Sequence, residues 1–350
     1  MAGSTDRLAK RLVTWQRQYG RHHLPWQQTR DPYHVWLSEI MLQQTQVTTV
    51  RDYYQRFLEQ FPSVRDLALA DIDTVLSRWA GLGYYARARN LHACAQAVVR
   101  DWGGEFPRCA QDLQTLPGIG PSTAAAIAAF CYGEQAAILD GNVKRVLARH
   151  FGIDDDVSQT RTINKLWAIA RQELPDARQI TQAPDTMARY TQGLMDLGAT
   201  VCVRRKPLCK KCPLQATCIA YRDNLTDVLP FKAVKTRARR IEELQFFLIR
   251  HDDHILLQKR PPKGIWGGLW CLPMDLSVIP DLSQASPLPM ASFDHELTHF
   301  RMIITPSQVD LPVHEERPAP EDINCRWVHD DALDQYGLPK PIRDLVRPNS

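Results

Sequence analysis

The chain has 350 residues, which is enough for about two domains of ordinary size. Apolar residues make up 44% and charged residues 23%, so a disordered, collagen-like or coiled-coil chain is excluded. The sequence contains no run of about 18 apolar residues, so no membrane-spanning helix is expected. The net charge is only +4, yet residues 202–240 carry eleven Lys or Arg against two acidic residues. This stretch is either a solvated linker or a binding surface for a polyanion such as nucleic acid.

Helices are expected one after another up to about residue 197. Asp31 and Pro32 form a helix start, with a capping carboxylate and a proline in the first turn. Apolar residues from Tyr33 to Met41 then recur at helical spacing along one face. Further helices are expected at 66–79, 85–101, 110–115, 122–131, 142–151, 160–172 and 185–197. No alternation of strand type occurs here, so residues 1–221 are expected to form an all-α domain.

The pattern changes after a basic connector at 222–240. Short stretches of strand type, separated by loops rich in Gly or Pro, predict strands at 244–250, 254–259, 299–305 and 325–329. A last helix is expected at 341–346. Residues 241–350 are therefore expected to form a smaller α+β domain.

The chain contains nine cysteines and begins without the apolar core of a secretory signal. An odd number of cysteines in such a chain favours a reducing compartment, where clustered thiols bind metal more often than they pair. Four of them form a C-x6-C-x2-C-x5-C pattern: Cys202, Cys209, Cys212 and Cys218. Zinc sites often use two CxxC pairs and this pattern has one, so a [4Fe–4S] cluster is favoured over zinc, with disulfides as the remaining alternative.

Two motifs could present backbone or carboxylate groups at a helix start. In LPGIGPSTA, Gly118 and Gly120 precede a helix that begins near Ser122, which favours a tight turn with positive φ and a phosphate bound at free N–H groups. An ordinary turn between helices is the alternative. In ILDGNVKR, Asp140 precedes another helix, where it is either an N-cap or a carboxylate held ionised opposite a developing cation.

Other polar residues lie among large apolar or aromatic side chains. Glu39, in SEIMLQQTQ, is either a surface glutamate or a partly desolvated acid that holds a proton near neutral pH. Gln43 and Gln44 either face solvent or fill a gap in a stack of bases. In GLGYYARAR, Tyr84 lies beside glycines and arginines, which suits either a helix start with core tyrosines or a wedge that enters DNA.

Taken together, these residues resemble the adenine DNA glycosylases of the helix-hairpin-helix superfamily. The motifs LPWQ, VWLSEIMLQQTQV, GLGYYARARNLH, LPGIGPSTA, ILDGNVKRVLAR and LMDLGA and the cysteine pattern carry the resemblance over residues 5–230. It implies an all-α domain split in two, with double-stranded DNA bound across the cleft and a [4Fe–4S] cluster. It also implies removal of adenine mispaired with 8-oxoguanine or guanine in base excision repair. We further expect a monomer that acts in the cytoplasm, at the nucleoid if the source is bacterial.

The resemblance implies roles for single residues. Glu39 matches the acid that protonates N7 of a flipped adenine, and Asp140 matches the carboxylate that stabilises the oxocarbenium-like sugar. Gln44 and Tyr84 match residues that fill or wedge the vacated stack, and Gln43 is expected to contact DNA beside them. The adenine pocket is matched by Trp26, Gln27, Leu42 and Gln192.

One position separates two branches of the superfamily. Enzymes of the endonuclease III type carry a lysine at the place of Ser122, and that lysine forms a Schiff base and cuts the strand, which a serine cannot do. The chain is therefore expected to be monofunctional and to leave an abasic site. The alternatives are an oxidised-pyrimidine glycosylase and lyase of the endonuclease III type, and a non-enzymatic iron–sulfur sensor bound to DNA.

The C-terminal part resembles the Nudix-like domain of the same family through LLQKRP and GIWGGLW. It lacks the REx2EE-type run of Nudix hydrolases, so nucleotide hydrolysis is not expected. In the family, a loop that ends in Phe-Ser/Thr-His reads 8-oxoguanine. Here Thr298 and His299 keep the hydroxyl and the imidazole, and Leu297 replaces the aromatic ring, which bears on how strongly the lesion is discriminated.

Overall fold

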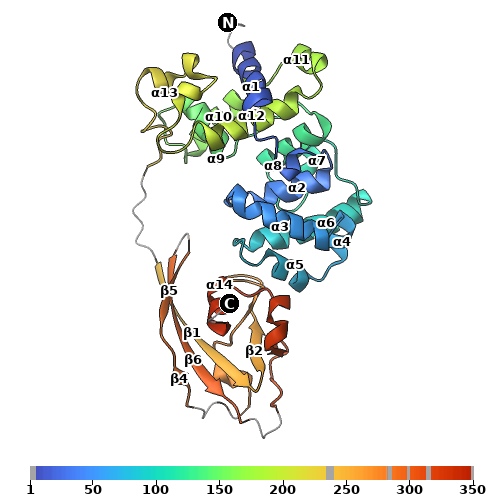
Figure 1. Cartoon of the computed structure of the whole chain (residues 1–350), viewed down its shortest axis with the longest axis vertical. Coiled ribbons are helices and arrows are strands. Elements are labelled where there is room, and N and C mark those ends of the chain that lie inside the picture. Colours follow the sequence, from blue (N-terminus) through green and yellow to red (C-terminus); the bar gives the residue numbers. More distant parts are fainter. Residues whose placement is uncertain are drawn as a thin grey trace. The chain divides into compact units, whose positions relative to one another are not determined.

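The computed structural model describes residues 5–233, 240–280, 282, 286–297, 300–312 and 317–347. Contacts divide the chain into two compact units, residues 1–65 with 93–235 and residues 66–92 with 236–350. Figure 1 shows the helices of the first unit and the sheet of the second. Within the described part of the chain, no helix is long and apolar enough to cross a membrane.

The first unit is helical, which confirms the expected class. A short turn, η1 (Pro25–Gln27), lies between its first two helices. Its helices are α1 (Thr5–Tyr19), α2 (Pro32–Met41), α3 (Val47–Gln60), α7 (Ala110–Leu113), α8 (Pro121–Ile127), α9 (Gly141–His150), α10 (Thr160–Gln172), α11 (Ala177–Gln182), α12 (Thr186–Thr200) and α13 (Ile219–Arg222), together with α6 (Ala86–Trp102), which both units share. A π-helical turn, Ala128–Tyr132, follows α8 directly.

A single helix expected at 66–79 is in fact two, α4 (Val64–Leu69) and α5 (Ile72–Trp79). Asp71 causes the break, because its carboxylate accepts a hydrogen bond from the amide of Asp73 at 2.8 Å and so caps a new helix. The capping carboxylate is visible in the sequence, but the apolar period continues across it and hides the boundary.

Helix α12 packs against both α1 and α9, and two glycines allow the close approach. A Cβ atom at Gly193 would lie 2.9 Å from Cγ of Leu12, on α1. A Cβ atom at Gly198 would lie 2.6 Å from Cβ of Asn142, in the first turn of α9. Any larger side chain would therefore push the helices apart. The backbone around the start of α9 is held in place by this contact.

The second unit contains a mixed sheet in which β1 (Arg240–His251), β2 (His254–Lys259), β6 (Phe300–Asp310) and β7 (Cys325–His329) are the longer strands. The strand order is β3-β2-β1-β6-β4, with β5 paired to β6 and β7 paired to β2. Only β1 and β6 run parallel among the described strands, in register from Arg240 opposite Phe300 to Arg250 opposite Asp310. Helix α14 (Lys340–Val346) ends the described chain, so the α+β class is confirmed.

Alternate residues of the long strands enter two different cores. Phe246, Leu248 and Ile255 belong to one buried cluster, whereas Ile249 and Leu256 belong to another, as expected for the two faces of a sheet. The sequence did not predict β3 (Trp270–Cys271), β4 (Leu288–Pro289) or β5 (Phe293–Glu296). Strands of two to four residues are too short to show alternation.

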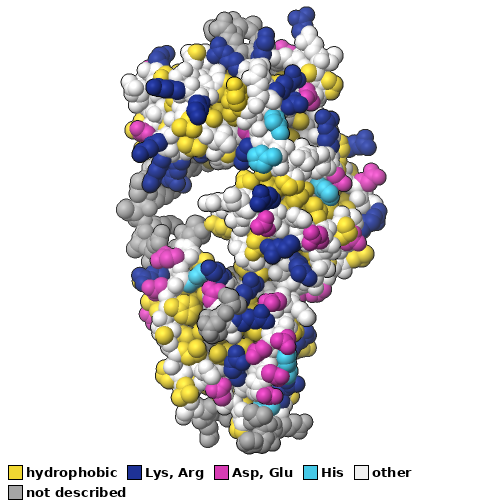
Figure 2. Space-filling view, viewed as in Figure 1, with side chains coloured by type: hydrophobic (Ala, Val, Ile, Leu, Met, Phe, Trp, Pro, Cys, Tyr) yellow, Lys and Arg dark blue, Asp and Glu magenta, His cyan; other side chains and the backbone are white. Residues whose placement is uncertain are grey.

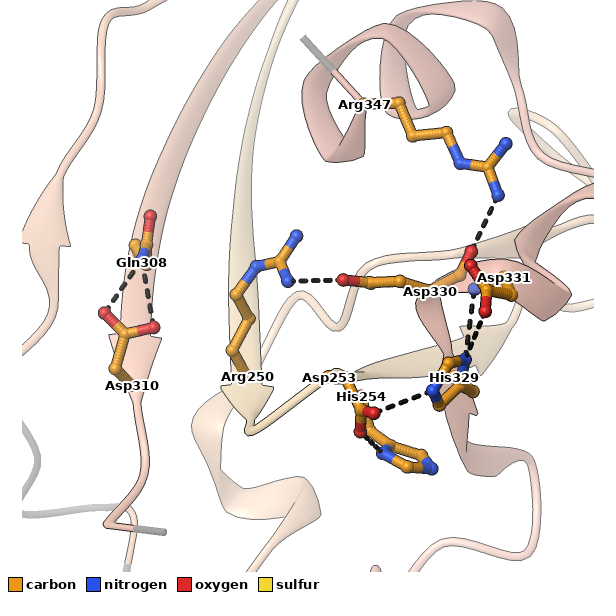
Figure 3. A network of polar contacts seen from close by, with 9 residues as sticks. All are labelled: Arg250, Asp253, His254, Gln308, Asp310, His329, Asp330, Asp331 and Arg347. Carbon is orange, nitrogen blue, oxygen red and sulfur yellow. Dashed lines mark hydrogen bonds and ion pairs between the residues drawn. The ribbon is translucent and has the colours of Figure 1, made fainter. Parts of the chain in front are cut away.

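A polar network lies at the turn between β1 and β2 (Figure 3). The carboxylate of Asp253 contacts Nδ1 of His254 at 2.6 Å and Nε2 of His329 at 2.7 Å. Asp330 accepts hydrogen bonds from Arg250 at 3.0 Å and, through its backbone carbonyl, from Arg347 at 2.7 Å. The network joins strands β1, β2 and β7 to α14. Its ion pairs are partly exposed, so each pair contributes little to stability.

Candidate active site

Glu39 lies near the end of α2, a helix whose other side chains are mostly buried. Trp36, Leu37 and Ile40 are at most 4% exposed, and Glu39 is half-buried beside them. Burial raises the pKa of Glu39 to about 8, and the negative charge of Asp140 adds to this shift. The carboxyl group of Glu39 therefore holds its proton at pH 7.

Asp140 is the N-cap of α9, because its carboxylate accepts a hydrogen bond from the amide of Val143 at 2.7 Å. Burial raises the pKa of Asp140, but hydrogen bonds from the amides of Val143 and Asn142 and the charges of Arg145 and Lys144 oppose this rise. The net direction for Asp140 is still a raised pKa, but unlike Glu39 it has four neighbouring groups that favour its charged form. The two interpretations of this residue, an N-cap and a carboxylate held ionised, are compatible.

Both carboxyl groups line one cleft, which we call the Asp140 cleft. The loop after α2, the start of α8, the start of α9 and the end of α12 all contribute to it. Its lining includes the expected residues Gln43, Gln44 and Ser122 as well as Arg145, Met195 and Arg204. Residues up to 183 positions apart in the sequence, from Arg21 to Arg204, thus line one cleft.

Ser122 joins the start of α8 to the segment that carries Asp140. Its hydroxyl accepts a hydrogen bond from the amide of Leu139 at 3.0 Å. Gly118 has a φ of +75°, as the motif predicted. Gly120 instead has an extended backbone, with a φ of −84°, because it is the N-cap of α8 and cap residues leave the helix in the extended region. The tight turn expected from the two glycines is therefore present, with its positive φ at Gly118.

A second cavity adjoins Glu39, and we call it the Trp26 cavity. It is lined by all four residues expected to form the adenine pocket, namely Trp26, Gln27, Leu42 and Gln192. Its volume is about 230 Å³, several times the share of one water molecule, which is about 30 Å³ in the liquid. The ring of Trp26 is fixed by an edge-on contact with Tyr54, with the ring centres 5.3 Å apart.

The side-chain amide of Gln27, in the Trp26 cavity, lacks hydrogen-bond partners. Both its amide nitrogen and its amide oxygen are buried, and neither has a hydrogen-bond partner among the described residues. A buried polar group without a partner costs about 1–3 kcal/mol. The amide of Gln27 is thus prepared to give one hydrogen bond and to accept another in the Trp26 cavity.

Gln192 is held by a network that sequence reasoning missed. Its amide nitrogen donates to Oδ1 of Asp196 at 2.9 Å. The same carboxylate accepts hydrogen bonds from the side chain of Arg21 at 2.7 Å and from its backbone amide at 3.0 Å. Asp196 is fully buried, and LMDLGA alone gives no hint of a partner 175 residues away.

Gln44 and Tyr84 have left-handed backbone conformations, with φ of 59° and 49°. Such conformations are unusual for residues other than Gly, Asn and Asp, and they cluster at functional sites. Gln44 lines the Asp140 cleft, and Tyr84, in the second unit, is 46% exposed. Thr298 and His299, expected to read the opposing base, lie outside the described residues.

The four cysteines of the pattern line one further cavity, the cysteine cavity: Cys202, Cys209, Cys212 and Cys218. Across the described segments, no three His, Cys, Asp or Glu side chains are grouped closely enough to hold a single metal ion. The basic side chains between the cysteines, from Arg204 to Lys211, are exposed. Figure 2 shows many Lys and Arg side chains on the part of the first unit that holds α10 and α13.

Family models match both parts of the chain. The model described as "HhH-GPD superfamily base excision DNA repair protein" matches residues 37–172, and the model described as "NUDIX domain" matches residues 245–347. The solved structure of a thermostable thymine-DNA glycosylase is 29% identical, with a TM-score of 0.54, and covers 63% of this chain and 97% of its own. The helical part therefore has the fold of the helix-hairpin-helix base-excision glycosylases.

Curated relatives are more specific. The chain is 35% identical to the adenine DNA glycosylase of Buchnera aphidicola (subsp. Acyrthosiphon pisum, strain APS), over 96% of this chain and 95% of the relative. It is 43% identical to the adenine DNA glycosylase of Mus musculus, over 60% of this chain and 41% of the relative. The chain belongs to the adenine DNA glycosylase family.

Glu39→Gln should stabilise the protein in a pH-dependent way. A carboxyl group with a pKa near 8 in the folded state and near 4.5 when unfolded costs stability as the pH rises between these values. The variant lacks this cost. Its advantage in free energy of unfolding should be absent below pH 4.5 and reach the order of a few kcal/mol at pH 9. Urea denaturation of the variant and the wild type below pH 4.5 and at pH 9 measures the difference. If the two proteins were equally stable at both pH values, the shifted pKa of Glu39 would be contradicted.

Gln27→Leu should raise the free energy of unfolding by about 1 kcal/mol, because it removes two buried polar atoms that lack partners. Gln192→Leu is the matched control and should lower it, because it takes a donor from the buried Asp196. Chemical denaturation of both variants measures the difference. A loss of stability in Gln27→Leu equal to that in Gln192→Leu would show that the amide of Gln27 is satisfied.

Proposed function

We propose that this chain is an adenine DNA glycosylase, a hydrolase that excises adenine mispaired with 8-oxoguanine or guanine in duplex DNA. One observation carries the proposal: Glu39, whose pKa is raised to about 8, lines the same cleft as Asp140, whose carboxylate accepts backbone hydrogen bonds at the start of α9. Cleavage of a glycosidic bond needs an acid for the leaving group and an anion for the sugar cation. The family to which the chain belongs supports adenine as the base.

The target nucleotide has to leave the duplex before Glu39 can reach it. Flipping costs a few kcal/mol and is easiest for a mispaired base. Inside the Trp26 cavity, the free amide of Gln27 offers one acceptor and one donor, which complement the amino group and N1 of adenine. We assign to Gln43, Gln44 and Tyr84 the filling of the space that the base leaves in the duplex.

The chemical steps use the two carboxyl groups in turn. Glu39 gives its proton to N7 of adenine while the bond between N9 and C1′ breaks, and the electron pair of that bond stays on the base. The carboxylate of Asp140 stabilises the positive charge that develops on the sugar. Water then adds to C1′ and releases a proton to Glu39, which restores the acid and leaves an abasic site.

Among the described residues that line the Asp140 cleft, none is a lysine that could cleave the strand. A Schiff base requires an amine, and the hydroxyl of Ser122 is engaged by the amide of Leu139. We therefore propose a monofunctional enzyme that leaves the sugar–phosphate backbone intact.

A single-turnover assay on a duplex with adenine opposite 8-oxoguanine tests both proposals. Adenine should be released, and strand breaks should appear only in the half of the reaction treated with alkali. Breaks without alkali would indicate lyase chemistry. Release from thymine glycol duplexes in place of the adenine mispair would favour the endonuclease III type of activity.

Asp140→Asn should slow base release by roughly 100-fold to 1,000-fold, the usual effect of losing one group that stabilises transition-state charge. Asn is as good an N-cap as Asp, so the free energy of unfolding should change little. Asp140→Ala should lose both activity and about 1 kcal/mol of stability. Full activity in Asp140→Asn would remove the charge of Asp140 from the mechanism.

We propose that the cysteine cavity holds a [4Fe–4S] cluster. Four thiols from one loop line the cavity. Four thiolates suit a cluster, in which each of four irons takes one of them, and the single CxxC pair of the pattern favours the cluster over zinc. When bound, the cluster supplies no group to base release. It holds the loop that carries the exposed basic residues from Arg204 to Lys211.

Cys209→Ser should therefore reduce the iron content of the purified protein and weaken DNA binding more than it slows base release at saturating DNA. Cys94→Ser is the control, because Cys94 is a buried cysteine outside the pattern. Iron and acid-labile sulfide analysis with a DNA titration checks the outcome. One zinc and no iron per wild-type chain would contradict the cluster.

The remaining assignments complete the proposal. Residues 1–221 form the catalytic domain, 222–240 the connector, and 241–350 the domain that reads 8-oxoguanine through Thr298 and His299. The protein acts as a monomer on double-stranded DNA in the cytoplasm, at the nucleoid of a bacterial cell.

A further inference from the structure

His150 is the last residue of α9, and it lines the cysteine cavity together with the four cysteines. The residue is 8% exposed. Nδ1 of its ring is buried and has no hydrogen-bond partner among the described residues. Among the described residues that line this cavity, no other buried side-chain nitrogen or oxygen lacks a hydrogen-bond partner.

The rest of the cavity wall already satisfies its polar atoms. The buried guanidinium of Arg149 donates to the carbonyl of Val203 at 2.7 Å and to that of Leu229 at 2.8 Å. It also donates to Sγ of Cys202 at 3.5 Å, and Sγ of Cys218 lies 3.6 Å from the carbonyl of Arg149. Hydrogen bonds to sulfur are thus part of this cavity.

A buried nitrogen without a partner is rare in folded proteins because it gives up its hydrogen bonds to water. The group that the four cysteines are proposed to hold would occupy the cavity that His150 lines. Cluster sulfurs accept hydrogen bonds, and such bonds help to set the reduction potential of the cluster.

We infer that His150 donates a hydrogen bond from Nδ1 to a sulfur of the [4Fe–4S] cluster and thereby raises its reduction potential. The inference rests on the cluster proposed above. A donor stabilises the more negative, reduced form of the cluster, and the guanidinium beside Cys202 acts in the same direction. His150 thus tunes the cluster and is not one of its ligands.

His150→Phe tests the inference on the purified holoprotein by direct electrochemistry. Loss of the donor should shift the one-electron redox equilibrium about tenfold towards the oxidised cluster. This shift corresponds to a midpoint potential that is about 59 mV lower than in the wild type. His92→Phe is the matched control. His92 is equally buried at 8% exposure, but its Nε2 contacts the carbonyl of Ala70 at 2.9 Å in the second unit, so no shift is expected. An unchanged potential in a fully loaded His150→Phe protein would overturn the inference.

A second measurement needs no substitution. In wild-type holoprotein labelled with 15N-histidine, pulsed EPR of the oxidised cluster should detect coupling to an imidazole nitrogen, since His150 is the one histidine in the described lining of the cavity. Iron and sulfide at full content without this coupling would overturn the role of His150 alone. A wild-type protein without iron and sulfide would overturn the cluster as well.

Discussion

Burial of the Glu39 carboxyl group, to which the negative charge of Asp140 adds, is the constraint on which the site depends. Burial alone would raise the pKa of both groups, and two equal acids would be of little use to catalysis. The amides of Val143 and Asn142 and the nearby cations favour ionisation of Asp140, whereas both influences on Glu39 favour its proton. The start of one helix therefore gives Asp140 groups that favour its charged form, and Glu39 has none of them.

Packing elsewhere in the helical unit keeps this start of α9 in place. Gly198 lets α12 approach the first turn of α9, and Ser122 fixes the amide of Leu139 just before it. The same helix ends at His150, beside the cysteine cavity, so ten residues connect the carboxylate to the cysteine loop.

Much of this could be predicted from the sequence, for reasons that are local. Asp140 and the glycine after it predict a helix start from the sequence alone. Four cysteines at close spacing in the sequence must also lie near one another in the fold. The network of Arg21, Asp196 and Gln192 could not be predicted, because its members meet only after folding. The lack of a hydrogen-bond partner for the amide of Gln27 could not be predicted either, because it leaves no pattern in the sequence. The short strands were not predicted because each of them depends on pairing with a neighbouring strand and shows no alternation of its own.

The most direct test is a 13C NMR titration of the Glu39 carboxyl carbon, assigned by its absence in Glu39→Gln. In the wild-type protein the carboxyl group of Glu39 should titrate near pH 8. In Asp140→Asn its titration midpoint should fall, because the neighbouring negative charge of Asp140 is gone. A midpoint near 4.5 in both proteins would contradict the account, since Glu39 would then be ionised at neutral pH and could not serve as the acid.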